Sequence, residues 1–311
     1  MLEPSLIHYP NAGGRYFAAT RPQFLLATVL AYALGVVTAL YAGLAMHLAY
    51  ALTGLGLALL VHAGVNLLND YYDALNGTDD LNTERLYPYT GGSRFIQNGV
   101  LSTAQVAGFA YLLLAIVTLA GLYLSYVLGL GLLALGLFGV GLAWAYSAPP
   151  WRLNSRGLGE FCVLLGFLGV SLGAYYLQAS AYSWQVVIIA MPYALLVTNL
   201  LYINQFPDCK ADALAGKRHW VVRLPFKLAR LVYPMLASLA CAWLVYFIYL
   251  GALPQSAMWS ALPILLSARA SYLLGLAQDK PANLLVAIKL TLAAMLGHGL
   301  LLVLVLIKEL Q

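Results

Sequence analysis

The sequence predicts an all-α integral membrane protein with nine transmembrane helices. Of its 311 residues, 62% are hydrophobic and only 9% are charged, and the mean hydropathy is +0.83. Soluble domains carry about 25% charged residues, so this composition excludes an ordinary soluble enzyme. Apolar runs of roughly 20 residues recur along the chain, and that length lets a helix cross a hydrocarbon core of about 30 Å.

Nine apolar runs are long enough to serve as spans. The first two are separated by a tight turn near Ala42 to His47. Together the spans predict one membrane domain over residues 1–311. The expected spans are residues 24–44, 46–68, 104–126, 129–148, 158–178, 184–204, 228–250, 258–277 and 283–307.

Positive charge alternates from link to link and predicts the orientation. The links after spans 1, 3, 5 and 7 contain no Lys or Arg, whereas the N-terminal segment and the other links are basic. By the positive-inside bias, the N-terminus and the long links are cytoplasmic and the C-terminus lies on the opposite side. The net charge of +5 is thus concentrated on one face, which suits an anionic lipid surface or an anionic ligand.

The cysteines and the N-terminus indicate no special processing. Cys162, Cys209 and Cys241 are isolated, without metal or redox spacing, and are expected to be small core residues. The first twenty residues contain no apolar stretch typical of a cleavable signal peptide, so the first span is the expected insertion signal.

Two acidic motifs follow spans 2 and 6. The first is NLLNDYYDALNGTDD, residues 66–80, and the second is NQFPDCKADALAGKR, residues 204–218. DALNG and DALAG within them match at four of five positions, each where a helix is expected to end at a glycine. This placement, four spans apart, predicts an internal duplication with halves of about 1–150 and 151–311.

Each motif places its polar residues on one helical stripe. Asn66, Asp70 and Asp73 share one face of a helix, as do Asn204, Asp208 and Asp212, which lie close to Pro207. Carboxylates clustered near hydrocarbon need compensating cations. Hard oxygen ligands on two helix ends suit Mg²⁺ that also binds substrate phosphates. The neighbouring cations Arg94, Lys210, Lys217 and Arg218 then indicate a site for a metal-chelated diphosphate.

Two other interpretations stay open at this point. Asp and Asn at a helix end beside a membrane are commonly solvated caps. An ion-coupled transporter could also use paired carboxylates, although these would be expected near the middle of the spans rather than at their ends.

The two motifs resemble the aspartate-rich motifs of the UbiA superfamily of intramembrane prenyltransferases, and the resemblance covers essentially the whole chain. GGSRFIQNGVLS (91–102), YSAPPWRLNSRGLGE (146–160) and the tail AGKRHWVVRL are similar to the 1,4-dihydroxy-2-naphthoate prenyltransferase branch. Gly77 stands where members that use 4-hydroxybenzoate more often carry Asp. Ser155, in turn, stands where the naphthoate branch carries an aromatic residue.

The resemblance implies an Mg²⁺-dependent transfer of a prenyl group from a polyprenyl diphosphate to an aromatic acceptor, in the first place 1,4-dihydroxy-2-naphthoate in menaquinone biosynthesis. The alternatives are another acceptor (a phenolic acid, a tetrapyrrole or a lipid alcohol) or a carrier of lipid diphosphates that does not react. The implied setting is the lipid bilayer of a bacterial inner membrane, with the site on the cytoplasmic face and no nucleic acid as partner.

The resemblance also implies roles for particular residues. The expected Mg²⁺ ligands and catalytic residues are Asp70, Asp73, Asp208 and Asp212. The expected substrate-binding residues are Asn66, Asn204, Arg94, Arg156, Lys217, Arg218, Tyr146 and Tyr72. Arg21, His62 and Asp79 are further candidates for the same pocket, and Arg269 and Lys289 are charges inside predicted spans.

Overall fold

The computed structural model describes residues 2–278 and 280–311, and over these residues its regular elements are all helical. The elements in chain order are α1 (Ala12–Ala19), α2 (Pro22–Tyr41), α3 (Leu48–Leu75), α4 (Thr78–Leu81), α5 (Thr103–Leu128), α6 (Leu130–Ser147), η1 (Leu153–Arg156), α7 (Gly159–Ala179), α8 (Trp184–Leu214), α9 (Trp220–Arg223), α10 (Phe226–Tyr249), η2 (Gln255–Leu265), α11 (Leu266–Leu276) and α12 (Ala282–Lys308).

Nine segments of the described chain are long and apolar enough to cross a membrane, as the sequence predicts. The eighth is composite, because η2 runs directly into α11. The second and sixth spans are longer than predicted and continue to Leu75 and Leu214. Residues 66–75 of the first motif and 204–214 of the second therefore form the last helical turns of α3 and α8.

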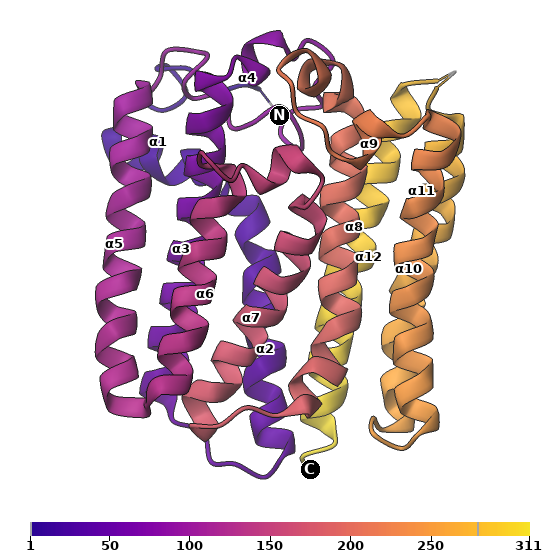
Figure 1. Ribbon diagram of the computed structural model, residues 1–311. Helices are drawn as coiled ribbons and strands as arrows, with labels where there is room; N and C mark the ends of the chain where they lie inside the picture. Colours follow the sequence, from indigo (N-terminus) through magenta and orange to yellow (C-terminus); the bar gives the residue numbers. More distant parts are fainter. Residues whose placement is uncertain (1, 279) are drawn as a thin grey trace.

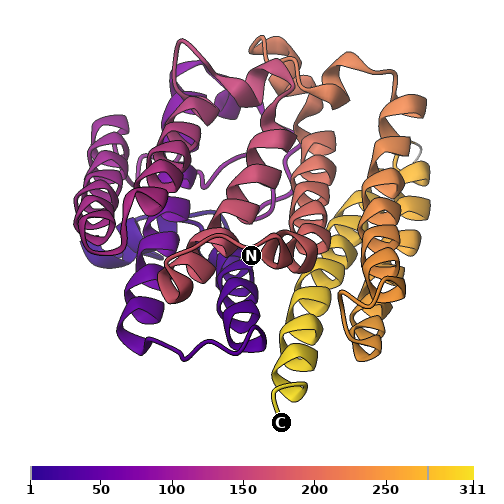
Figure 2. The ribbon, with the colours of Figure 1, turned by 60° about the horizontal axis from the view of Figure 1, so that its bottom comes forward.

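The spans run side by side, and the described chain begins and finishes at opposite ends of the bundle (Figure 1). The short helices α1, α4 and α9 gather at one end, which we call the motif end (Figure 1). In both views α5 lies at one edge of the bundle and α10 and α11 lie at the other (Figures 1 and 2).

Helix α8 is the central span. Of its most apolar stretch 78% is buried, compared with 17% for α6. Its buried tyrosines find backbone acceptors on neighbouring helices: Tyr193 donates to the Ala27 carbonyl (3.0 Å) and Tyr202 to the Ala229 carbonyl (2.7 Å). A buried hydroxyl without such a partner would cost free energy, so these bonds allow polar rings in the core.

The helices that carry the motifs end in the same way. Helix α3 ends at Leu75 with Gly77 two residues on, and α8 ends at Leu214 with Gly216 two residues on. Both glycines are left-handed, with φ of +77° and +79°, which is the usual glycine position at a helix end. The local match of DALNG with DALAG is therefore structural, while the duplication of the whole chain stays a prediction.

Pro207 does not interrupt α8. The helix continues through it to Leu214 and keeps Asp208 and Asp212 on helical turns. A proline lacks the N–H that would bond the carbonyl four residues earlier, so the Ile203 carbonyl loses its helical donor there.

Candidate active site

A cavity of about 680 Å³ lies between α2, α3, α5, α6, α7 and α8. Most of its wall is made of Leu, Val, Gly and Phe residues. At the motif end the wall becomes polar, and it carries Arg21, Asn66, Asn69, Tyr146 and Asn204. Such a shape can hold an apolar chain with a polar group at one end.

The first motif folds against the turn GGSR, residues 91–94. The backbone N–H of Ser93 donates to the buried Asp70 carboxylate, 3.1 Å from Oδ2. Gly92 has φ +72°, and a Cβ there would lie 2.5 Å from Asp79 Oδ2 and 3.1 Å from Asp70 Oδ1. Asp70 and Asp79 therefore approach the same point of the turn, and only glycine leaves room for them.

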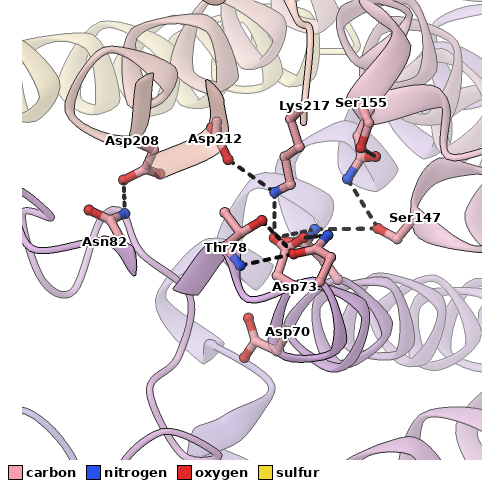
Figure 3. Close-up of polar contacts among 12 residues, drawn as sticks. Asp70, Asp73, Thr78, Asn82, Ser147, Ser155, Asp208, Asp212 and Lys217 are labelled. Carbon is pink, nitrogen blue, oxygen red and sulfur yellow. Dashed lines mark hydrogen bonds and ion pairs between the residues drawn. The ribbon is translucent and has the colours of Figure 1, made fainter. Parts of the chain in front are cut away.

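The second motif is held by the same link. Asn82 Nδ2 donates to Asp208 Oδ1 at 2.6 Å, and the Gly91 N–H donates to Asp208 Oδ2 at 3.3 Å. The link that follows α3 thus reaches the acidic end of α8 (Figure 3).

Lys217 joins the two motifs directly. Its Nζ lies between the carboxylates of Asp73 (2.8 Å) and Asp212 (3.2 Å), and all three side chains are buried (Figure 3). Burial alone would lower the pKa of Lys217, but the carboxylates of Asp73 and Asp212 outweigh burial and raise it, so the side chain is a cation. His219 Nε2 lies 2.9 Å from the other oxygen of Asp212.

Asp79 is the least compensated acid of the site. Burial raises the pKa of its carboxyl well above the ordinary value, and the carboxylates of Asp73 and Asp70 raise it further. Its Oδ2 is buried without a hydrogen-bond donor among the described residues. A bound cation would both occupy this oxygen and favour the charged form of the carboxyl, so Asp79 is a candidate cation ligand.

The donor set fits Mg²⁺ that a phosphate ligand shares. Among the described residues no three His, Cys, Asp or Glu side chains are close enough to hold an ion by themselves. Mg²⁺ in phosphate sites is commonly held by one or two carboxylates, and phosphates and waters complete its octahedron. Asp70 and Asp79 on one side, and Asp208 and Asp212 on the other, could each supply such ligands.

Six of the eight predicted substrate-binding residues line the cavity, the basic pocket or the junction of the two motifs. Asn66, Asn204 and Tyr146 line the cavity, and Asn204 Oδ1 has no hydrogen-bond partner among the described residues. Lys217 is the bridge just described. Arg156 and Arg218 line a separate basic pocket at the motif end.

Tyr72 and Arg94 do not line the cavity. The Tyr72 hydroxyl lies 3.0 Å from the Tyr111 hydroxyl on α5. Arg94 is buried and donates to the Asp79 carbonyl at 2.5 Å, and its Nε lies 4.0 Å from Glu3. In this position Arg94 holds the Asp79 backbone in place, and the geometry gives no support for substrate contact by either residue.

The further candidates are also located. Arg21 and His62 line the cavity, where His62 Nδ1 lies 2.7 Å from the Thr28 hydroxyl. Arg269 is exposed and lies over the Tyr272 ring at 5.2 Å, which is a cation–π contact. Lys289 is exposed on α12, away from the cavity wall.

Sequence reasoning missed three residues of the site. Asn69 lines the cavity and donates to Asp73 Oδ2 at 3.1 Å. Its spacing of three from Asn66 was the available signal. His219 follows Lys217 by two positions and could have been found as a base near acids. Asn82 bonds Asp208 across 126 positions, and no local pattern marks it.

Several curated proteins that are similar to this chain bear the same name. A 1,4-dihydroxy-2-naphthoate octaprenyltransferase of Mycobacterium tuberculosis is 32% identical over 205 residues, which are 66% of this chain and 67% of that protein. Its Escherichia coli counterpart is 32% identical over 186 residues, 57% and 58% of the two chains. Most of the curated relatives are thus matched over less than two thirds of their length.

Solved structures show the same fold. A UbiA homolog from Archaeoglobus fulgidus, bound to DMAPP and Mg²⁺, superimposes with a TM-score of 0.65 at 18% identity and covers 93% of this chain and 99% of its own. An apo UbiA homolog from Aeropyrum pernix K1 gives 0.64 at 19% identity, covering 91% and 98%. Residues 25–296, most of the sequence, match the UbiA prenyltransferase family. The chain is an integral membrane protein that belongs to the UbiA prenyltransferase family.

Proposed function

We propose that the protein transfers a prenyl group from a polyprenyl diphosphate to an aromatic acceptor in an Mg²⁺-dependent reaction. The observation that carries the proposal is the juxtaposition at the motif end. There the apolar cavity of about 680 Å³ becomes polar directly beside two acidic motifs that Lys217 joins. An amphiphile with an apolar chain and a diphosphate head matches both parts.

The acids would hold the metal and the diphosphate head. We assign Asp70, Asp73, Asp208 and Asp212 as Mg²⁺ ligands, with Asp79 as a further one. Asp73 and Asp212 also share their carboxylates with Lys217. When bound, Mg²⁺ neutralises charge on the diphosphate and so makes it a better leaving group. Arg21 lines the cavity, and its buried Nε has no partner among the described residues, so it is free to donate to a phosphate oxygen.

The cavity wall would protect the reactive carbon. When the allylic C1–O bond breaks, its electron pair leaves with the diphosphate oxygen and C1 becomes a cation. The ring of Tyr146 lines the polar end of the cavity, and the rings of Phe24 and Phe167 line it as well. Their faces can stabilise the cation, and the surrounding leucines exclude the water that would quench it.

The acceptor supplies the electrons for the new bond. We propose 1,4-dihydroxy-2-naphthoate, because several relatives at about 32% identity bear that name. Its ring carbon C2 forms the bond to C1, and the carboxylate on C2 leaves as carbon dioxide, which returns the bonding electrons to the ring. Carbons, charges and electrons balance without a further base.

The proposed setting is a bacterial inner membrane with the motif end on the cytoplasmic side. The N-terminal segment and the links that follow the even-numbered spans are basic, which supports this orientation. It gives a charged, water-soluble acceptor direct access to the site, while the prenylated product leaves into the lipid.

The test is a transfer assay with purified protein, labelled prenyl diphosphates, Mg²⁺ and a panel of acceptors. Prenylated naphthoate together with released carbon dioxide, lost in Asp70→Ala and Asp208→Ala, is the expected result. Asp80→Ala is the matched control, because Asp80 is exposed in the same link. If another acceptor gave the product, the transfer reaction would stand and 1,4-dihydroxy-2-naphthoate would be replaced as the proposed acceptor. Mg²⁺-dependent binding without any product would instead favour a carrier.

A further inference from the structure

A second, smaller pocket of about 270 Å³ lies at the motif end, outside the acid site. It opens between the segment 152–156, which includes η1, and the link that follows α8. Its described wall contains five cationic side chains and no large apolar side chain. The lining residues are Asn76, Arg152, Ser155, Arg156, Ala215, Gly216, Lys217, Arg218 and Arg223.

Four of the five cations of this pocket, the arginines, have no acidic partner in the described part of the chain, whereas Lys217 is paired with Asp73 and Asp212. No Asp or Glu lines the pocket, and none of its four arginines forms an ion pair within the described part of the chain. Like charges gathered in one concave surface repel each other and raise the local concentration of anions. The pocket therefore favours a multivalent anion.

The pocket is held in shape by backbone contacts. Arg156 donates to the Pro150 carbonyl at 2.7 Å, and Arg223 donates to the Arg156 carbonyl at 2.8 Å. The Arg218 N–H donates to the Ser155 carbonyl at 2.8 Å and so ties the two walls together. Guanidinium groups fixed in this way lose little entropy when they bind an anion.

Two residues separate this pocket from the acid site. Lys217 lines the pocket, while its Nζ bonds Asp73 and Asp212. Asn76 also lines the pocket, and its side-chain oxygen accepts the Thr78 N–H at 2.9 Å, at the junction of α3 and α4. In Figure 3 Ser155 of the pocket lies on the opposite side of Lys217 from Asp212. An anion that leaves the acid site thus meets the arginines one side chain away.

We propose that this basic pocket is a second anion site, which receives the inorganic diphosphate released by the acid site. The lining favours a compact polyanion over an aromatic acid, because it offers no ring and no large apolar side chain. Its volume equals that of about nine waters at roughly 30 Å³ each, which is room for a hydrated diphosphate. The source of the diphosphate rests on the proposed function, whereas the binding itself does not.

The test measures diphosphate binding without metal. Purified full-length protein in phosphatidylcholine nanodiscs, with EDTA present, is titrated with labelled inorganic diphosphate. The acid site repels diphosphate when no metal is present, so binding reports on the basic pocket. We expect saturable binding that Arg152→Gln/Arg156→Gln weakens about tenfold or more, the equivalent of about 1.4 kcal/mol. Asp70→Asn should leave it unchanged.

A charge-matched control separates the pocket from general surface charge. Lys227→Gln/Lys280→Gln removes two exposed cations elsewhere and should leave the affinity within about twofold. Equal weakening by the lysine pair, or no metal-free binding by the wild type, would overturn the proposal. Retained Mg²⁺-dependent binding of prenyl diphosphate shows that the arginine variant is folded.

Two further measurements, lipid enrichment in mixed nanodiscs and transferase activity, distinguish the possible sources of the anion. Arginine-dependent enrichment of phosphatidylglycerol in mixed nanodiscs, without diphosphate binding in neutral ones, would reassign the pocket to a lipid headgroup and overturn the proposal. If the protein transfers prenyl groups but does not bind diphosphate in the absence of metal, the second anion site is wrong and the proposed function stands. Arginine-dependent binding by a protein without transferase activity would support the anion site and overturn the proposed function.

Discussion

The Lys217 ammonium donates to Asp73 across 144 positions of sequence, at 2.8 Å, and both side chains are buried. With Asp212 on its other side, this lysine is the charge that allows α3 and α8 to bring their acids together. Removing one partner of a buried ionic network leaves the other charges uncompensated.

We therefore expect Lys217→Met to be strongly destabilising. The loss should be about 3–5 kcal/mol, because two buried carboxylates lose their cation. Lys210→Met is the matched control: Lys210 pairs with Glu84 in an exposed position and should contribute no more than about 1 kcal/mol. Unfolding in mixed detergent micelles measures both. Equal stability of the two variants would contradict the role given to Lys217.

Asp79→Asn should stabilise the metal-free protein and weaken its response to ligand. The raised pKa of Asp79 means that its charged form is disfavoured by folding, so stability falls as pH rises from the unfolded value near 4 through the folded pKa. At pH 7 an uncharged amide removes this cost. Added Mg²⁺ and diphosphate should raise the melting temperature of the wild type more than that of the variant.

The control for Asp79→Asn is Asp80→Asn. Asp80 is the exposed neighbour in the same short helix and should behave as wild type in both measurements. A metal-free Asp79→Asn protein that melts below the wild type at pH 7 would contradict the prediction.

Gly92→Ala should damage the acid site. A Cβ there would lie 2.5 Å from Asp79 Oδ2, and φ is +72°, so the carboxylates of Asp79 and Asp70 must move. A misplacement of about 1 Å can cost roughly 100-fold in rate. Gly99→Ala carries a similar backbone penalty, with φ +66°, but its Cβ would meet no described residue within 4 Å. Comparison of the two turnover numbers isolates the contact with the acids.

Gly173→Leu should select against long prenyl chains. Gly173 lines the cavity on α7, 14 residues from Gly159 at the motif end, or about 21 Å at 1.5 Å per residue. A leucine there would block the deep part of the cavity and leave the polar end unchanged. Competition between labelled donors of different length measures the shift. Gly108→Leu, on an exposed position of α5 outside the cavity wall, should leave the preference unchanged.

Much of the fold follows from the sequence because the membrane permits few alternatives. Backbone groups in lipid must be satisfied internally, so apolar runs of this length become helices. The acids of both motifs reach one end of the bundle because each follows an even-numbered span. Gly77 and Gly216 mark the helix ends because the left-handed conformation there favours glycine.

The direction of individual side chains did not follow from the sequence. Arg94 is basic and lies beside the motif, yet it has φ +67° and bonds the Asp79 carbonyl, whereas Arg21 lines the cavity. Tyr72 lies within the motif, but its hydroxyl meets Tyr111 on α5. These outcomes depend on tertiary contacts, which a spacing of three or four along one helix does not specify.

The cavity lies to one side of the bundle. Its described lining comes from α2, α3 and α5 to α8, while α10, η2, α11 and α12 contribute nothing to it. Those last spans instead pack with α8 in the largest cluster of buried side chains. Helices α2 and α8 thus serve both the cavity and this cluster, whereas the last spans serve the cluster alone. We therefore expect that exchanging these spans between relatives would change the packing around α8 and leave the cavity wall, and with it the choice of substrate, unchanged.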